Sequence, residues 1–152
     1  MLFVCLGNIC RSPMAEGVFR HLVREAGLAD RITVDSAGTG AYHIGEPPHH
    51  GTRRVLKERG IDDTGLVARQ VKHTDLEQFE YIIAMDQANA ADLERLRRSG
   101  GGNRVHLLTD FVPDAPVKDV PDPWYTGNFE AVYDLVDAGC RGLLARIQSE
   151  LE

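Results

Sequence analysis

A thiol and a guanidinium stand close together near the start of the chain, in the segment Cys5-Leu6-Gly7-Asn8-Ile9-Cys10-Arg11. Backbone N–H groups in a tight loop that leads into a helix point inward and, with the helix dipole, hold a tetrahedral oxyanion. Gly7 and Asn8 tolerate the positive φ angles that such a loop needs. The N–H groups and the cation of Arg11 favour the thiolate of Cys5, which is a nucleophile. The segment therefore predicts phosphoryl chemistry on Cys5, with the planar fork of Arg11 on two phosphate oxygens.

The flanking residues predict the elements that position this segment. Leu2 to Val4 is a short apolar run typical of a buried strand. Ser12 is a favoured residue before a helix, and Pro13 fits the first helical position. Residues Leu6 to Arg11 are therefore expected to form a loop between a strand and a helix, with Cys5 at its base.

The same spacing occurs again between Cys140 and Arg146, where its meaning differs. Apolar residues recur at helical spacing from Phe129 to Leu151, so Cys140 is expected inside a helix, without a ring of free N–H groups. We interpret Cys140 as a buried core thiol. The spacing alone is weak support, and the elements around Cys5 carry the prediction.

Cleavage of an aryl phosphate also needs an acid, because an unprotonated phenolate is a poor leaving group. Asp122 is the candidate, since Pro121 and Pro123 restrict the backbone on both sides and fix the direction of its side chain. Without a nucleophile elsewhere in the chain, this tripeptide would be interpreted as an ordinary turn. Asp114 and Asp119 lie on the same loop and are interpreted as solvated turn residues.

Strand and helix signals alternate along the chain, which predicts an α/β fold with a four-stranded parallel open sheet and helices on both faces. The expected strands cover Leu2–Val4, Ile32–Asp35, Tyr81–Met85 and Val105–Leu108. The expected helices cover Pro13–Ala26, Thr52–Arg59, Gln87–Arg98 and a final helix from near Asn128. Ligands bind beyond the carboxyl ends of such strands, so Cys5 and the loop around Asp122 are expected at one edge of the sheet.

Three acidic residues and one threonine have expected local roles. Thr74 and Glu77 match a capping box before a short turn. Asp86 is expected to cap the helix that follows it. Asp35 and Asp86 both follow strands, so either is a candidate to orient Arg11.

Composition limits the class of protein. The 152 residues, 43% hydrophobic and 26% charged, have the balance of a globular protein, and we expect residues 1–152 to form a single domain. The net charge of −6 argues against a nucleic-acid partner. The absence of a twenty-residue apolar run and of signal-peptide features predicts no membrane association and a cytoplasmic location. Three cysteines fit a reducing compartment and match no zinc site, and the six histidines are interpreted as surface residues, so no metal or other cofactor is expected.

Cys5 to Glu16 resembles the phosphate-binding loop of the low-molecular-weight protein tyrosine phosphatases. The segments Val34–Thr39, Ala68–Gln70, Ala84–Asp86 and Asp122–Tyr125 follow in the order that this family shows. The resemblance spans nearly the whole chain. It implies a flavodoxin-like phosphatase fold, a tyrosine-phosphorylated protein as substrate and inorganic phosphate as product; we expect a monomer or weak dimer.

The resemblance also assigns roles to residues. It implies that Cys5 is the nucleophile of a metal-independent hydrolysis through a cysteinyl-phosphate, with Arg11 stabilising charge and Asp122 as general acid. The expected phosphate-binding residues are Leu6, Gly7, Asn8, Ile9, Cys10, Arg11 and Ser12. Ser12 is expected to donate its hydroxyl to the thiolate, and Asn8 and Ser36 to hold the loop in shape. Tyr42, Trp124 and Tyr125 are expected at the rim of the substrate cleft, where an aryl ring stacks.

Two positions have more than one interpretation or depart from the family pattern. A reversible disulfide between Cys5 and Cys10 is geometrically plausible, and the resemblance implies that it protects the nucleophile, although packing explains Cys10 equally well. Several members carry a histidine shortly before Ala68, where this chain reads Leu66-Val67. That part of the hydrogen-bond network must therefore differ here.

Three alternatives remain. Protein arginine phosphatases share the fold but have a threonine at the position of Ile9, so tyrosine is the favoured substrate. Thioredoxin-coupled arsenate reductases need further cysteines to resolve their intermediate, and only Cys140 is available, in a distal helix. A non-catalytic phosphopeptide-binding module would not need Cys5, Arg11 and Asp122 together.

Overall fold

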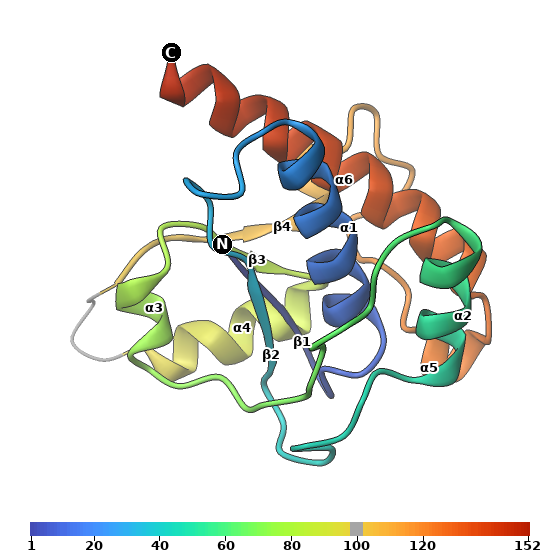
Figure 1. Ribbon diagram of the computed structural model, residues 1–152. Coiled ribbons are helices and arrows are strands. Elements are labelled where there is room, and N and C mark those ends of the chain that lie inside the picture. The colour runs from blue at the N-terminus through green and yellow to red at the C-terminus, as the bar shows by residue number, and fades with distance from the viewer. Residues whose placement is uncertain (98–101) are drawn as a thin grey trace.

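The computed structural model describes residues 1–97 and 102–152, and within them the chain forms the expected parallel sheet, shown in Figure 1. Its four strands lie in the order β2-β1-β3-β4. Their bounds are Leu2–Cys5 for β1, Asp35–Gly38 for β2, Ile82–Ala84 for β3 and Val105–Leu107 for β4. The strand order reverses at β1, which places the carboxyl end of that strand at the point where open α/β sheets bind ligands.

Helices cover both faces of the sheet, as predicted. The structure has α1, α2 and α6 on one face and α3 and α4 on the other (Figure 1). The helical segments are α1 (Arg11–Glu25), α2 (His50–Glu58), α3 (Asp75–Gln78), α4 (Gln87–Leu96), the 3₁₀ turn η1 (Leu108–Phe111), α5 (Pro123–Thr126) and α6 (Phe129–Leu151). In the part of the chain that is described, no helix has the length and apolar character to cross a membrane.

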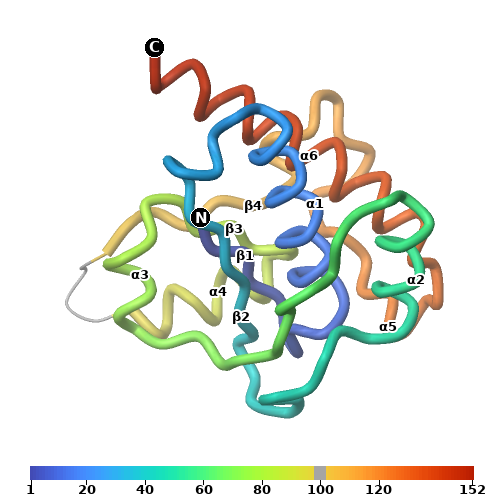
Figure 2. The backbone as a smooth tube through the Cα atoms, viewed as in Figure 1, coloured from blue at the N-terminus to red at the C-terminus, as the bar shows by residue number. Residues whose placement is uncertain are grey.

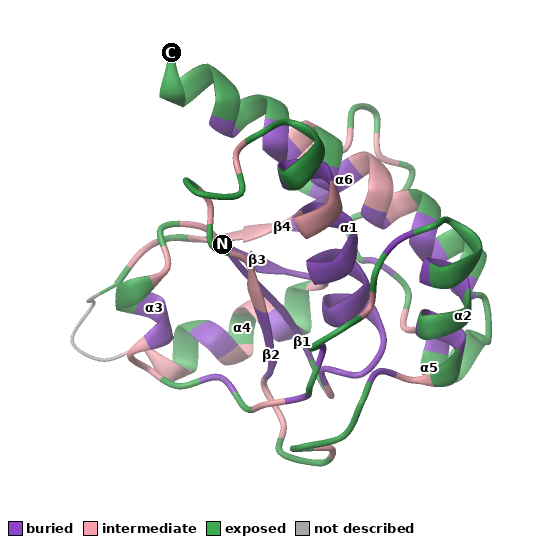
Figure 3. Cartoon of the chain, viewed as in Figure 1, coloured by how far each residue is buried: buried purple, intermediate pink, exposed green. Residues whose placement is uncertain are grey.

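Side chains of β1 alternate between two cores. Phe3 and Cys5 point into the core under α1 and α6, whereas Leu2 and Val4 point into the core under α3 and α4. Figure 3 shows β1 and the first turns of α1 as buried along their length. Because the strand is covered on both faces, it is a continuous apolar run, which is typical of a parallel sheet. This burial fixes the position of the residue that ends the strand, Cys5.

The second strand lies three residues later than the sequence indicates. The apolar residues from Ile32 to Val34 predicted the strand there, but β2 runs from Asp35 to Gly38, with Gly38 opposite Cys5. The prediction was wrong because β2 consists of small and polar residues. Ser36, Ala37 and Gly38 are buried, and Ser36 accepts a hydrogen bond from Asn8 in the loop after β1.

Other boundaries differ in smaller ways. Helix α1 begins at Arg11 rather than at Pro13, and Ser12 lies inside its first turn instead of capping it. The proposed capping box was wrong, since the Thr74 side chain makes no capping hydrogen bond and the carboxylate of Asp75 accepts from Lys72 N instead. The predicted end of the third helix at Arg98 lies outside the described residues, and α4 ends at Leu96.

The contact between α6 and η1 supplies a test of the fold. A Cβ on Gly142 would lie 2.0 Å from the carbonyl oxygen of Phe111, which is backbone and cannot rotate away. Alanine is favoured over glycine in helices by about 0.5–1 kcal/mol, whereas overpacking costs about 1–3 kcal/mol. We expect Gly142→Ala to lower the urea midpoint of unfolding. Ala145→Gly, an exposed change in the same helix, gives the size of the propensity effect alone, and a higher midpoint for Gly142→Ala would contradict the packing.

Candidate active site

The segment after β1 forms a tight loop with the sulfur of Cys5 at its base. Cys5 Sγ accepts a hydrogen bond from Asn8 N at 3.3 Å and lies 2.9 Å from Ser12 Oγ. Asn8 adopts φ of 56°, the left-handed conformation that glycine and asparagine favour. In the described part of the chain, the backbone N–H groups of Gly7, Ile9 and Cys10 donate to no protein acceptor. They are therefore available to an anion, as expected for a phosphate loop.

The side chain of Asn8 ties this loop to the rest of the molecule. Its Nδ2 donates to Ser12 Oγ at 2.8 Å and to Ser36 Oγ at 2.9 Å. Its Oδ1 accepts from the backbone N–H of Arg69 at 2.9 Å. Three of the four hydrogen bonds that a buried asparagine can make are thus satisfied, two of them by the sequence-distant residues Ser36 and Arg69. These bonds hold the left-handed turn and position Ser12 next to Cys5.

Arg11 is buried, and two hydrogen-bond acceptors on other segments hold its guanidinium. Nη1 donates to Asp86 Oδ2 at 2.7 Å and to the carbonyl oxygen of Val120 at 2.9 Å. Burial acts to lower the pKa of Arg11, but the charges of Cys5 and Asp86 raise it, and the net direction is upward. Arg11 is therefore a permanent cation beside the sulfur.

Of the two acids considered for orienting Arg11, only Asp86 does so. Asp86 also caps α4, as predicted, by accepting from Asn89 N at 2.7 Å. Asp35 lies at the start of β2, at the opposite end of the strand from the loop, and pairs with Arg69 at 3.1 Å. The earlier position predicted for the second strand had placed Asp35 at the wrong edge.

Asp122 faces the loop from the segment after β4. It immediately precedes α5, where its Oδ1 accepts from Trp124 N at 3.0 Å. The other oxygen, Oδ2, lies 3.6 Å from Arg11 Nη2. One oxygen is thus held by the helix start while the other is directed towards Arg11. Asp122 therefore serves both interpretations of Pro121-Asp122-Pro123: Oδ1 makes the local turn contact, and Oδ2 is free to act on the site.

These groups surround one cavity of about 410 Å³. It is lined by Cys5, Leu6, Gly7, Ile9, Cys10, Arg11, Tyr42, His43, Asp122, Trp124 and Tyr125. Cys5 is only 3% exposed, yet it lines this cavity, whereas Tyr42, Trp124 and Tyr125 are exposed at its mouth. The sites predicted from sequence therefore meet around one opening, with Asn8, Ser12 and Ser36 behind the loop. Figure 2 shows the chain after β2 passing close to the loop after β1.

One wall residue, His43, was missed from the sequence. Its ring lies 5.9 Å from the ring of Trp124, and Nδ1 lies 2.7 Å from Glu46 Oε2. His49, also read as a plain surface residue, stacks on Phe129 at 5.0 Å and meets Trp124 edge-on at 5.7 Å. The sequence could have indicated His43 as a wall residue, because it directly follows Tyr42, which was expected at the rim.

The loop carbonyls are also held from outside, which the sequence did not reveal. His49 N donates to the carbonyl oxygen of Ile9 at 2.7 Å, and Thr52 Oγ1 donates to that of Cys10 at 3.0 Å. The segment at the start of α2 therefore holds the outer side of the loop, and through His49 it also contacts Trp124 at the cavity mouth.

Cys140, Cys10 and Leu66 are all buried. Cys140 is buried in α6, as predicted, and Sγ lies 3.8 Å from the carbonyl oxygen of Ala15. Cys10 is buried, and burial followed by the charges of Cys5 and Asp122 raises its pKa to about 12. Leu66 packs in the core. Leu66 thus contributes packing in the segment where the resemblance implies a histidine.

The arrangement suits phosphoryl transfer. A sulfur at the base of a ring of free N–H groups, next to a fixed cation and a carboxyl, is an arrangement that can supply a nucleophile, an oxyanion site and a proton donor to one phosphate. Among the described residues, no cluster of three or more His, Cys, Asp or Glu side chains has the arrangement of a metal site.

Comparison with known proteins gives the same class. The sequence profile of the family described as low molecular weight phosphotyrosine protein phosphatase matches residues 1–152. The chain belongs to this family and is a phosphatase, a hydrolase of phosphoric monoesters.

Individual relatives cover almost the whole chain. It is 52% identical over 150 residues to the low molecular weight protein-tyrosine-phosphatase YfkJ of Bacillus subtilis, covering 99% of this chain and 96% of the relative. The crystal structure of YfkJ superposes with a TM-score of 0.96, covering 99% and 95% of the two chains. PtpA of Staphylococcus epidermidis is 44% identical, covering 93% and 89%. The crystal structure of DARP, a Drosophila arginine phosphatase, is 32% identical in sequence, with a TM-score of 0.89 and 96% of each chain covered.

Proposed function

We propose that this protein hydrolyses phosphotyrosine in proteins, without a metal, through a cysteinyl-phosphate on Cys5. The observation that carries the proposal is the position of Cys5 Sγ in the cavity that Arg11 and Asp122 share, with Asp122 Oδ2 3.6 Å from Arg11 Nη2. The names of the relatives at 52% and 44% identity support a tyrosine substrate.

In the first step, the Cys5 thiolate attacks phosphorus as the bond to the aryl oxygen breaks. The leaving oxygen takes the proton of the Asp122 carboxyl, so a phenol departs rather than a phenolate. The free N–H groups of Gly7, Ile9 and Cys10 bind the equatorial oxygens. Arg11, fixed by its bonds below the loop, adds the positive charge that a metal ion supplies in other phosphatases.

In the second step, water attacks the phosphocysteine. Asp122, now a carboxylate, accepts a proton from the water while the new P–O bond forms and the S–P bond breaks. Inorganic phosphate and the thiolate of Cys5 result. The carboxyl is suited to both steps because its Oδ1 stays bound to Trp124 N while Oδ2 exchanges the proton.

The cavity favours an aryl phosphate over a short alkyl phosphate. The sulfur lies at the bottom, and the rings of Tyr42, Trp124 and Tyr125 stand at the mouth. A phosphotyrosine carries its phosphate farther from the peptide backbone than a phosphoserine does, and its ring stacks on such walls. The apolar Ile9 on the loop side supports an aryl substrate rather than a guanidinium.

Turnover of phosphotyrosine, phosphoarginine and phosphoserine peptides of one sequence tests the proposal. We expect phosphotyrosine to be hydrolysed in the presence of a chelator, with kcat/KM at least about tenfold above that of the other two, a difference worth about 1.4 kcal/mol. Released phosphate is the measurement. A preference for phosphoarginine would replace the proposed substrate with that of the Drosophila protein, and a requirement for added metal would exclude the mechanism.

A further inference from the structure

We propose that Glu16, with Arg20 as its counter-ion, is a positioning residue whose carboxylate completes the hydrogen-bond network ending on Cys5. Glu16 lies on α1 and is 5% exposed. It does not line the substrate cavity, so any effect on the reaction must pass through other residues. The inference rests on the proposed function, because its consequence is read in the reactivity of the Cys5 nucleophile.

The direction of the network begins with the amide of Asn8. The backbone N–H of Arg69 can only donate, so the atom that receives it at 2.9 Å is the amide oxygen. The amide nitrogen of Asn8 is therefore turned towards Ser12 and Ser36, at 2.8 Å and 2.9 Å. Both serine oxygens then accept from Asn8, and neither can donate to it.

Each serine hydroxyl must place its own proton elsewhere. Ser12 Oγ lies 2.9 Å from Cys5 Sγ, so its proton is directed at the sulfur and stabilises a thiolate. Ser36 Oγ donates to Glu16 Oε1 at 2.6 Å. A carboxylate only accepts, so an ionised Glu16 keeps the Ser36 proton turned away from Asn8. An ionised Glu16 satisfies both partners at once, because Oε1 accepts from Ser36 while Oε2 pairs with Arg20.

The charge of Glu16 depends on Arg20. Burial raises the pKa of Glu16, while the bond from Ser36 and the charge of Arg20 act against the shift, and the net direction is upward. Arg20 Nη2 pairs with Oε2 of the same carboxylate one turn along α1. From β2, Asp35 also faces this carboxyl and opposes its ionisation, although Asp35 is itself paired with Arg69.

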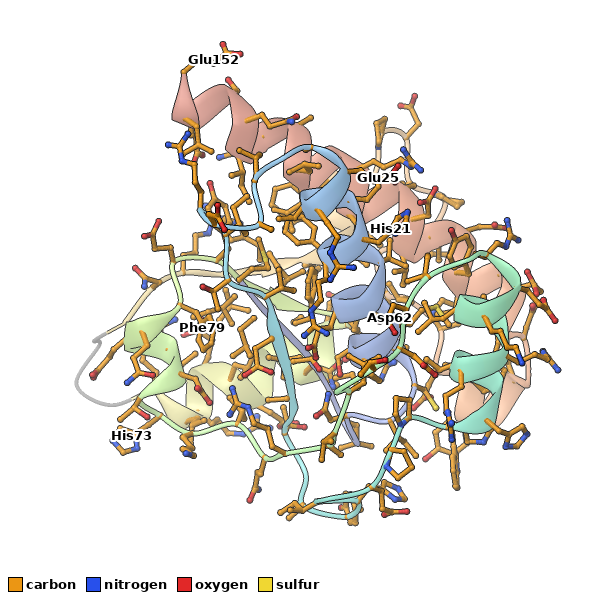
Figure 4. The ribbon with its side chains drawn as sticks, viewed as in Figure 1. His21, Glu25, Asp62, His73, Phe79 and Glu152 are labelled. Carbon is orange, nitrogen blue, oxygen red and sulfur yellow. The ribbon has the colours of Figure 1, made fainter. Side chains whose placement is uncertain are left out.

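The outer end of this network is open to solvent. The Arg20 side chain is 34% exposed and borders a second cavity of about 320 Å³ beside α1. Figure 4 labels three further residues of that cavity, His21 and Glu25 on α1 and Asp62 after α2. Because Arg20 is only partly buried, replacing it is expected to leave the fold intact, which makes the counter-ion the right point to test.

Arg20→Leu leaves a buried carboxyl without its cation, so Glu16 stays protonated to higher pH. A neutral carboxyl accepts from Ser36 more weakly than a carboxylate does, which loosens Ser36 and, through Asn8, the bonds that position Ser12 beside Cys5. We expect the acid limb of the kcat/KM profile on a phosphotyrosine peptide to move up by about one pH unit. Activity below the limb then falls about tenfold, and activity at alkaline pH stays near that of wild type. Alkylation of Cys5 by iodoacetate should shift in the same direction, independently of turnover.

Three further variants separate this effect from a merely structural one. Arg24→Leu removes a neighbouring cation from the same cavity and should keep the wild-type profile. Arg20→Lys retains the charge and should also keep it. In Arg20→Leu/Glu16→Gln, the side chain at position 16 is neutral at every pH, so the shift of the acid limb should disappear and kcat/KM should be lowered across the whole profile.

The outcomes distinguish this inference from the proposed function. Wild-type protein that fails to hydrolyse the phosphotyrosine peptide would overturn the function itself. An active wild type whose acid limb matches that of Arg20→Leu would overturn only the role of Glu16 and Arg20. A double variant that keeps the shifted acid limb of Arg20→Leu would do the same, because the shift would then not come from the ionisation of Glu16.

Discussion

Serine in place of Cys5 is expected to abolish turnover, with a loss on the order of 10⁴-fold or more. The hydroxyl occupies the same position but is a far weaker nucleophile at neutral pH, so no covalent intermediate forms. The free N–H groups of the loop and the cation of Arg11 remain, so the affinity for phosphate or vanadate should stay measurable. Hydrolysis of p-nitrophenyl phosphate and phosphate binding by calorimetry are the two measurements.

Cys140→Ser is the matched control for that experiment. Cys140 is fully buried in α6, away from the cavity, and a serine hydroxyl can keep the contact with the carbonyl oxygen of Ala15. We expect this variant to retain turnover while losing some stability in urea. Undiminished turnover by Cys5→Ser would eliminate the cysteinyl-phosphate mechanism, whatever the control shows.

Asp122→Asn should have the second largest effect, and the effect should depend on the leaving group. The amide keeps the oxygen that accepts from Trp124 N, so the start of α5 is preserved. It has no acidic proton, and the loss of a general acid typically costs about 10²–10⁴-fold. We expect the full loss with a phosphotyrosine peptide and a much smaller loss in the first step with an activated aryl phosphate. Single-turnover rates for the two substrates measure this difference.

Asp114→Asn provides the comparison on the same loop. Asp114 is exposed and adopts φ of 52°, which asparagine tolerates well. Its replacement removes one carboxylate from the loop without altering the backbone, so turnover should stay close to wild type. An equal loss for both leaving groups in Asp122→Asn would show that Asp122 only shapes the cavity and does not supply a proton.

The sequence predicted the fold where apolar periodicity and local capping agree. The run from Leu2 to Val4, the helix after it and the Asp86 cap are all visible in consecutive residues, and the structure confirms each of them. The second strand was misplaced because its own residues are small and polar. Hydrophobic patterning favoured the apolar residues before Asp35, which pack only partly against the core.

In the candidate site, the sequence predicted the reactive side chains but not the groups that hold them. Residues such as Cys5 and Asp122 have a chemistry that can be read from the side chain and its neighbours in the sequence. The groups that hold them do not: the carbonyl of Val120 under Arg11 and the backbone N–H of Arg69 on Asn8 are main-chain atoms, which every residue has. Only the three-dimensional arrangement assigns them a partner.

The order in which the cavity is assembled has a consequence for synthesis of the chain. Cys5 leaves the ribosome before most of the sheet, whereas the carbonyl of Val120 and the carboxyl of Asp122 follow more than a hundred residues later. Contacts between such distant parts form late in folding. A nascent chain should therefore remain inactive until the last third of the sequence has been translated. In refolding experiments, phosphatase activity should return only when the whole fold has formed.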